Sequence, residues 1–302
     1  MPKLILWGLF AVGAVLLVVA LNTGRQYLEW SPFDETPAER AERLAGHWRL
    51  VRPEGPGPHP AAILLSGCDG VRDNMDYWAG VLVETGRAAL IVDSHTPRGL
   101  NRLESWRLVC AGQTLSGAER AGDIAVALQA LPQLGDFSDD VVIFGASHGG
   151  WSAMEFIAHA VAHEPIPGLA GWPEDPDALL GTVSALVLLY PYCGALNSAT
   201  AERWSGAPPA LLVLAEKDSV VSSPDCIALA DALDADGASV EVALIAGADH
   251  GFDQREKSPF STLEFDAGQR EQAATAVLEF LSRLDGARAS APLMPRREEP
   301  AG

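Results

Sequence analysis

The chain has 302 residues, 48% of them hydrophobic, and a formal net charge of −19. This apolar content can build a sizeable core, which excludes the composition typical of a disordered chain. The acidic balance, with no basic cluster in the body of the chain, argues against a nucleic-acid-binding protein, because such proteins neutralise phosphates with lysine and arginine.

The first predicted element is an uninterrupted apolar run from Leu4 to Leu21. It is long enough to cross a bilayer as a helix, which needs ~20 residues. Lys3 before the run and acidic residues after it predict that the amino end stays in the cytoplasm and the rest is exported. A cleaved signal peptide is the alternative, because Val18-Val19-Ala20 fits a small-residue cleavage site. Residues 1–24 are therefore interpreted as a signal anchor or a signal peptide.

The polar segment that follows, residues 25–46, is predicted to be a tether with one short helix. Thr36-Pro37 resembles a helix N-cap with proline at the first helical position. A folded domain is expected over residues 47–285, beginning with a strand at His47–Val51. Residues 286–302 are rich in Arg, Glu and Pro, which predicts a disordered tail.

Within the domain, short apolar runs alternate with longer segments of helical spacing. The predicted strands are 61–65, 88–92, 141–144, 183–190, 210–215 and 240–245, and the predicted helices are 73–84, 116–131, 148–163, 224–233 and 267–284. Continuous apolar strands separated by helices predict a doubly wound, mostly parallel sheet with helices on both faces. In such α/β sheets, ligands bind at the carboxyl ends of the strands.

Residues 163–182 interrupt this alternation, because the segment contains four prolines. We expect a loop insertion there. Such a loop either covers the site as a lid or is a plain surface excursion.

The strand at 141–144 leads into Gly145-Ala146-Ser147-His148-Gly149 and then into a helix. This strand, turn and helix form the context in which a G-x-S-x-G motif acts as a nucleophile elbow. Small residues around the serine let neighbouring segments approach and hold its hydroxyl at the strand end. Ser147 is therefore the predicted nucleophile.

A serine hydroxyl needs a base to take its proton and an acid to orient that base. In this fold the order along the chain is serine, acid, histidine. Asp218 follows the strand at 210–215, and His250 follows the strand at 240–245, so these two residues are predicted to complete a triad. Glu216 and Asp249 are the competing acids, although Asp249 adjoins the histidine and would rarely reach its ring.

Acyl transfer also needs backbone donors for the developing oxyanion. The N–H of His148 and the N–H of Cys68, in the loop after an early strand, are the predicted donors. The alternative that the Cys68 thiol is itself a nucleophile lacks a partner base in the pattern. His95 also follows a strand and is a candidate for the pocket wall.

The four cysteines allow three pairings, and their spacing alone does not select one. They are Cys68, Cys110, Cys193 and Cys226. None lies in a cluster with zinc-ligand spacing, so no metal site is expected.

These residues together resemble the dienelactone hydrolase family, in particular its exported bacterial branch, over about residues 50–284. The features that carry the resemblance are Leu64-Leu65-Ser66-Gly67-Cys68-Asp69-Gly70, Val92-Asp93-Ser94 with Pro97-Arg98-Gly99, Val109-Cys110 before Ala118-Glu119-Arg120, Ser147-His148-Gly149-Gly150, and Asp249-His250-Gly251-Phe252. The resemblance implies an α/β-hydrolase fold, a monomeric or weakly associating enzyme without a cofactor, and a triad of Ser147, Asp218 and His250. It also implies the pairs Cys68 with Cys110 and Cys193 with Cys226.

Two positions depart from the family pattern. Ser147 occupies the place of the cysteine nucleophile of the namesake enzymes, and Ser66-Gly67 replaces the usual His-Gly before the oxyanion loop. The resemblance therefore implies a mechanism rather than a substrate.

The sequence predicts a serine hydrolase that cleaves an ester, lactone or similar acyl bond of a small-molecule substrate through an acyl-enzyme. A cell-envelope peptidase or acyltransferase with the same triad is an alternative, as is an envelope binding module that has lost turnover. The expected location is the bacterial cell envelope. The protein would be anchored in the inner membrane facing the periplasm, or secreted or periplasmic if residues 1–24 are removed.

Overall fold

The computed structural model describes residues 2–258 and 261–290. Its centre is a seven-stranded sheet in the order β1-β3-β2-β4-β5-β6-β7. The strands are β1 (Trp48–Val51), β2 (His59–Leu65), β3 (Ala88–Val92), β4 (Phe137–Ala146), β5 (Val183–Leu189), β6 (Ala210–Ala215) and β7 (Val240–Ile245). β1 pairs with β3 antiparallel, and the other neighbours are parallel. The predicted fold class, a mostly parallel α/β sheet after an N-terminal apolar helix, is confirmed.

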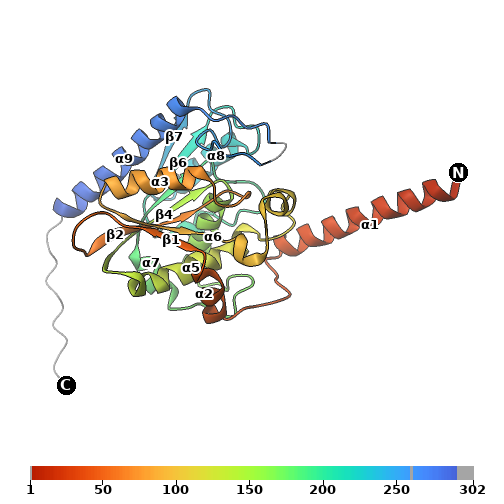
Figure 1. Ribbon diagram of the computed structural model, residues 1–302, viewed down its shortest axis with the longest axis horizontal. Helices are drawn as coiled ribbons and strands as arrows, with labels where there is room; N and C mark the ends of the chain where they lie inside the picture. Colours follow the sequence, from red (N-terminus) through yellow and green to blue (C-terminus); the bar gives the residue numbers. More distant parts are fainter. Residues whose placement is uncertain (1, 259–260, 291–302) are drawn as a thin grey trace, which may run out of the picture.

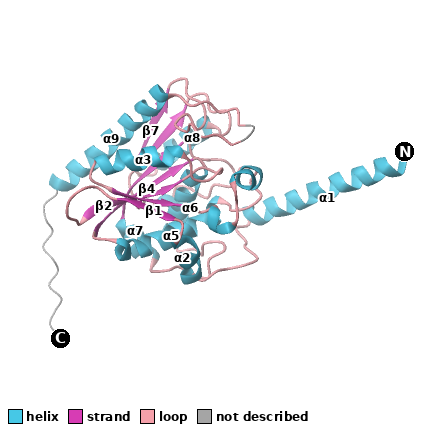
Figure 2. Cartoon of the chain, viewed as in Figure 1, coloured by secondary structure: helices cyan, strands magenta, loops and turns pink. Residues whose placement is uncertain are grey.

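Helices cover both faces of the sheet (Figure 1, Figure 2). The longer helices are α1 (Pro2–Tyr27), α2 (Pro37–Ala45), α3 (Asp73–Glu84), α5 (Gly117–Leu134), α6 (His148–Ala162), α7 (Pro176–Thr182), α8 (Ser223–Ala235) and α9 (Ala267–Ser290). Successive strand residues point to opposite faces. Ile63 and Leu65 of β2 accordingly belong to the core cluster that contains residues of α5, α6 and α8, whereas Ala62 and Leu64 belong to the cluster that contains residues of α3 and α9.

The segment 163–182 is not a lid. Its second half forms α7, which is N-capped by Asp175 and packs on α5, α6 and the neighbouring strands β4 and β5. Asp177 of α7 lines a shallow hollow together with Asp139 and Ser184, which lie in the amino-terminal halves of their strands. The segment therefore lies at the edge opposite the strand ends where ligands bind, as in the surface-excursion alternative.

The C-terminal helix is longer than the sequence predicts. α9 continues to Ser290, so residues 286–290, which were assigned to a disordered tail, are helical. The rest of that predicted tail, 291–302, lies outside the described residues.

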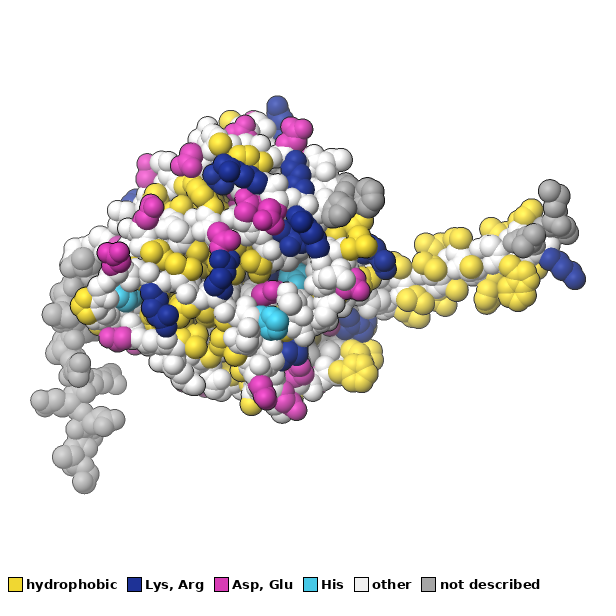
Figure 3. All heavy atoms as spheres, in the orientation of Figure 1, with side chains coloured by type: hydrophobic (Ala, Val, Ile, Leu, Met, Phe, Trp, Pro, Cys, Tyr) yellow, Lys and Arg dark blue, Asp and Glu magenta, His cyan; other side chains and the backbone are white. Residues whose placement is uncertain are grey.

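Helix α1 projects from one end of the body (Figure 1, Figure 3). Residues 5–27 are long and apolar enough to cross a membrane, and the 18-residue apolar window within them is not buried in the protein. The last turns of α1 already contact the body, because Asn22 and Gln26 donate to the backbone carbonyls of Gln113 and Gly112 at 2.8 and 2.9 Å.

The polar segment after α1, expected as a tether, is itself held on the body. The backbone of Glu35 bonds with Gly168 and Ala170, and the buried Arg40 of α2 pairs with Asp123 of α5 at 3.0 Å. The N-cap predicted at Thr36 is present, and it forms a capping box with Glu39. No free linker therefore separates α1 from the folded domain within the described residues.

Candidate active site

Ser147 lies at the turn between β4 and α6 with φ 52° and ψ −113°. A positive φ is uncommon for a residue with a side chain and marks a strained turn. The turn also requires close packing, since a Cβ at Gly145 would lie 2.4 Å from the Gly149 carbonyl oxygen, and one at Gly149 would lie 2.3 Å from the Leu65 carbonyl oxygen. Glycine at both positions lets the backbone segments meet and raises the serine hydroxyl at the strand end.

The structure brings the three predicted triad side chains together from the ends of β4, β6 and β7. The Ser147 Oγ lies 2.8 Å from His250 Nε2, and His250 Nδ1 lies 2.8 Å from Asp218 Oδ2. The side chain of Asp218 is fully buried, and its other oxygen accepts the backbone N–H groups of Val220 and Val221. The carboxylate is therefore held in one orientation toward the imidazole.

The two competing acids, Glu216 and Asp249, form hydrogen bonds with other groups. Glu216 accepts the N–H of Gly247, and Asp249 accepts the N–H and hydroxyl of Ser219 together with the N–H of His250. These bonds join the two loops that carry Asp218 and His250, and so they fix the spacing of the acid and the base.

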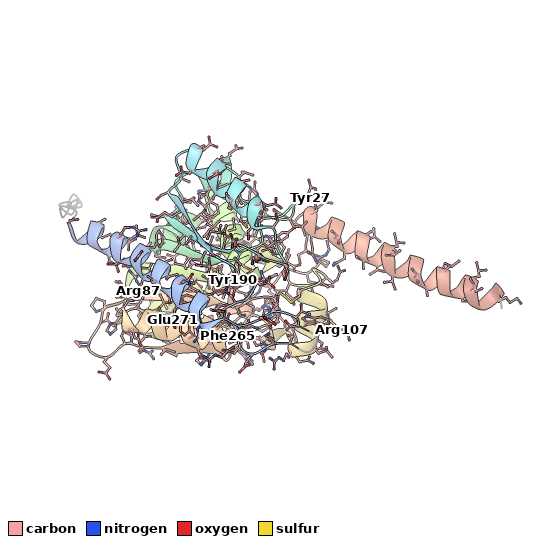
Figure 4. All side chains as sticks on the ribbon, turned by 90° about the horizontal axis from the view of Figure 1, so that it is seen from above. Tyr27, Arg87, Arg107, Tyr190, Phe265 and Glu271 are labelled. Atoms are coloured by element: carbon pink, nitrogen blue, oxygen red, sulfur yellow. A yellow bond between two sulfur atoms is a disulfide. The ribbon has the colours of Figure 1, made fainter. Side chains whose placement is uncertain are left out.

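A pocket of about 270 Å³ opens over Ser147. It is lined by Gly67, Cys68, Asp69, Asn74, Trp106, Cys110, Ser147, Tyr190, Val220, His250, Gly251, Gln254, Lys257, Ser258, Ser261, Thr262 and Leu263. Figure 4 labels Tyr190 in the interior of the body, between the helices of the two faces. The volume suits a small acyl group rather than a large ligand.

Both predicted oxyanion donors lie beside the serine. His148 is the first residue of α6, where backbone N–H groups have no partner within the helix. Cys68 lines the same pocket, and a Cβ at the preceding Gly67 would lie 3.7 Å from the Ser147 Cβ. The backbones of Cys68 and His148 therefore both lie close to the nucleophile.

Arg120 is a residue of the site that the sequence did not reveal. It is fully buried beneath the oxyanion loop and donates to the Ser66 carbonyl at 2.7 Å, to the Ser94 hydroxyl at 2.9 Å and to His148 Nδ1 at 3.2 Å. Burial lowers the pKa of Arg120 to about 10, and burial together with the Arg120 charge lowers the pKa of His148 to about 3. His148 is therefore neutral, and it accepts from Arg120.

His95 does not line the pocket, contrary to the sequence interpretation. Its ring is buried behind the oxyanion loop, where a Cβ at Gly70 would lie 3.7 Å from it. Burial and the nearby charge of Arg120 lower the pKa of His95 well below its usual value. It fills space beneath the site as a neutral side chain.

A second buried network, also missed, supports the base. Asp253 accepts hydrogen bonds from the Tyr190 hydroxyl, from Trp78 Nε1 at 2.7 Å and from Asn74 Nδ2 at 3.3 Å. The Tyr190 ring packs edge-on against His250, with 4.6 Å between ring centres. Burial raises the pKa of both Asp253 and Tyr190. The network therefore fixes the Tyr190 ring that packs against the imidazole.

All four cysteines are paired. Cys68 is bonded to Cys110, and Cys193 to Cys226, which are the pairs that the family resemblance implies. The alternative of Cys68 as a thiol nucleophile is therefore wrong, because its sulfur is in a disulfide. The first bond ties the oxyanion loop to the segment that forms the facing wall of the pocket.

Among the described residues, one group of side chains has the composition of a metal site: Glu29, His159 and Glu164. It lies where the chain after α1 meets α6, and Arg203 pairs with both glutamates. The Arg203 guanidinium supplies the positive charge that balances the two glutamates, so the group is an ion-pair cluster.

A mostly parallel sheet with a nucleophile elbow, and with an acid and a histidine at the ends of later strands, defines the α/β-hydrolase class of fold. Residues 177–284 match the sequence model of the dienelactone hydrolase family. The match includes Asp218 and His250, and it begins after Ser147. Over these residues the match confirms the family resemblance expected from the sequence, and no curated protein sequence matches the chain.

Solved structures agree in fold. A Klebsiella pneumoniae protein described as a candidate dienelactone hydrolase has a TM-score of 0.59 at 17% identity, covering 78% of this chain and 92% of its own. Thermogutta terrifontis esterase 2, phosphonylated by sarin, has a TM-score of 0.57 at 16% identity, covering 78% and 89%. A dienelactone hydrolase-like promiscuous phosphotriesterase from metagenomic libraries has a TM-score of 0.55 at 17% identity, covering 78% and 98%. Together with the family match, these neighbours support an ester-hydrolysing enzyme.

Proposed function

We propose that the protein is a serine hydrolase that cleaves carboxylic esters or lactones through an acyl-enzyme. The observation that carries the proposal is the continuous chain of hydrogen bonds from Ser147 through His250 to Asp218, with 2.8 Å at each step. Its pocket is of a size for a small acyl group.

In the first half of the reaction, His250 takes the proton of Ser147 as the hydroxyl oxygen attacks the carbonyl carbon. The backbone N–H groups of Cys68 and His148 stabilise the oxyanion. The bond to the leaving alcohol then breaks, and His250 donates the proton to that alcohol. In the second half, water repeats the attack on the acyl-enzyme with His250 again as base, releasing the acid and Ser147. Asp218 stabilises the imidazolium in both halves.

The test is the Ser147→Ala variant, with p-nitrophenyl acetate and butyrate as substrates. Removing the nucleophile of a serine triad costs on the order of 10⁶ in kcat where it has been measured, so turnover should fall to background. A fluorophosphonate probe should label the wild-type protein and not the variant. The same thermal unfolding midpoint in both proteins would show that the fold is retained. Equal turnover in the two proteins would contradict the proposal.

The structural neighbours also support the use of a fluorophosphonate probe. Thermogutta terrifontis esterase 2 is phosphonylated by sarin, and a pocket with an activated serine reacts with phosphorus esters for the same reason that it reacts with acyl esters.

We propose a hydrolase domain over residues 47–285, with 1–24 as an anchor in the bacterial inner membrane that holds the domain in the periplasm. The apolar helix and the two disulfides are compatible with export.

A further inference from the structure

Within the described residues, the folded domain is attached to α1 without a flexible linker. At ~1.5 Å per residue, the apolar run 4–21 spans about 27 Å, close to the ~30 Å thickness of the hydrocarbon core of a bilayer. Contacts with the body begin at the next residue, Asn22, and Arg25 pairs with Glu119 at 2.9 Å. When α1 crosses a membrane, the same face of the body must therefore lie at the headgroups.

Exposed aromatic side chains surround this junction. Tyr27, Trp30 and Phe33 lie where α1 meets the body, and Phe33 is 85% exposed. Figure 3 shows apolar side chains gathered at the base of the helix. Aromatic residues of this kind are enriched where a membrane protein meets the bilayer surface. Burial against the interface would remove their apolar surface from water.

The membrane-proximal face also carries a wall of the catalytic pocket. α1 bonds to Gly112 and Gln113, which closely follow Cys110. Cys110 and Trp106 line the pocket, and Cys110 is bonded to Cys68 beside the nucleophile. In Figure 1 the segment 101–115 lies next to the base of α1, and Figure 4 labels Tyr27 and Arg107 at this same end of the body.

The rim of the pocket includes an exposed apolar side chain, because Val220, which lines the pocket, is 59% exposed. Leu103 of the short helix α4 (Arg102–Glu104), three residues before the pocket-lining Trp106, is also exposed. The pocket of about 270 Å³ has room for the group next to a carbonyl but not for a whole lipid. The remainder of an amphiphilic substrate must lie outside it, against this rim.

We propose, resting on the serine hydrolase function above, that the substrates are amphiphilic esters resident in the bilayer that α1 crosses. The carbonyl enters the pocket from headgroup depth while the apolar chain stays in the membrane or against the rim at Val220. Ser147 forms the bond to the carbonyl carbon, the bond to the leaving oxygen breaks, and the proton moves through His250 to that oxygen. Water then releases the acyl group. The rigid junction serves to hold the pocket at the depth of the ester.

The experiment uses the full chain in phosphatidylcholine vesicles with two fluorogenic esters. 4-Methylumbelliferyl palmitate is embedded in the bilayer, and 4-methylumbelliferyl acetate is dissolved in the buffer. In the test variant, a flexible Gly-Ser segment of 20 residues is inserted between Leu21 and Asn22. It lets the body drift about 25 Å from the surface while every contact from Asn22 onward is retained. In the matched control the same segment is inserted after Lys3, on the other side of the span.

The wild-type protein and the Lys3 control should hydrolyse both esters, whereas the Leu21 insertion should lose at least about tenfold on the embedded ester and keep its rate on the soluble one. Equal rates of all three proteins on the embedded ester would overturn the proposal and leave the hydrolase function standing. A mature chain that lacks α1, seen by intact mass of the protein from membranes, would also overturn it. Inactivity of the wild type on both esters, without fluorophosphonate labelling, would overturn the hydrolase function and with it this inference.

Discussion

At the scale of single residues, Arg120 joins parts of the site that are far apart in sequence. Its guanidinium donates hydrogen bonds to the Ser66 carbonyl before the oxyanion loop, to the Ser94 hydroxyl after β3 and to the His148 ring beside the nucleophile. A planar guanidinium with five donors reaches acceptors spread more widely than the three donors on the single nitrogen of a lysine can. The positions of both proposed oxyanion donors therefore depend on a side chain that does not line the pocket in the described residues.

Arg120→Lys should lower kcat by about ten- to a hundredfold and leave KM within about twofold, because an oxyanion donor acts mainly in the transition state. The free energy of unfolding should fall by about 1 to 3 kcal/mol, since Ser66 or Ser94 loses its buried partner. Steady-state kinetics with a short p-nitrophenyl ester measure the separate changes in kcat and KM. A loss of stability with unchanged kcat would show that Arg120 is structural only.

At the scale of elements, α6 links the catalytic turn to the base of α1. His148 begins the helix at the site, and Glu155 lies two turns further on. Glu155 Oε1 accepts from Trp151 Nε1 at 2.6 Å and from the N–H of Ser198 at 2.9 Å, while its Oε2 has no hydrogen-bond partner among the described residues. Burial raises the pKa of Glu155 to about 7, so near neutral pH this helix carries a carboxyl that is partly protonated.

Glu155→Gln keeps the acceptor oxygen and removes the ionisation. The folded state holds a proton on Glu155 between pH 4.5 and about 7 that the unfolded state releases, so wild-type stability falls as the pH rises through this window. The variant should match the wild type near pH 4.5 and exceed it by on the order of 3 kcal/mol above pH 7. Urea unfolding at a series of pH values measures the difference. The exposed Glu174→Gln is the control and should follow the wild type. A constant offset for Glu155→Gln at all pH values would contradict the assignment.

At the scale of the whole molecule, the two disulfides hold the loops at the carboxyl edge of the sheet, where the pocket opens. Cys68–Cys110 closes a separation of 42 residues and Cys193–Cys226 one of 33. Closing loops of this length stabilises the fold by about 4 kcal/mol in the chain-entropy estimate. The bridges differ in one respect, since only the first contributes residues to the pocket.

Removing each disulfide separately should distinguish its effect on stability from its effect on activity. Cys193→Ala with Cys226→Ala should lower the free energy of unfolding by about 2 to 4 kcal/mol and leave kcat within about twofold. Cys68→Ala with Cys110→Ala should give a similar loss of stability and lower kcat by about tenfold or more, because the loop with the Cys68 N–H is released. Chemical unfolding and ester kinetics provide the two readouts. Equal kcat in both double variants would argue against an oxyanion role for that loop.

The sequence determined those parts of the protein whose signal is local. The elbow at Ser147 is a contiguous motif, and Asp218 and His250 follow from chain order at the ends of recognisable strands, because parallel strands bring their carboxyl ends to one edge. The apolar run of α1 is readable for the same reason. α7 carried a local signal too, an aspartate N-cap before Pro176, that was hidden among the neighbouring prolines.

Only the tertiary structure decided the rest, since it depends on packing between distant segments. Arg120 reaches partners 26, 54 and 28 residues away, and Asp253 reaches Asn74 across 179 residues, so no window of the sequence contains either network. His95 followed a strand as a pocket residue would, but burial behind the oxyanion loop placed its ring elsewhere. The docking of α1 onto the loop after Cys110 is of the same kind. The sequence determined that an apolar helix precedes a hydrolase, and the three-dimensional packing decided which face of the domain lies at the base of that helix.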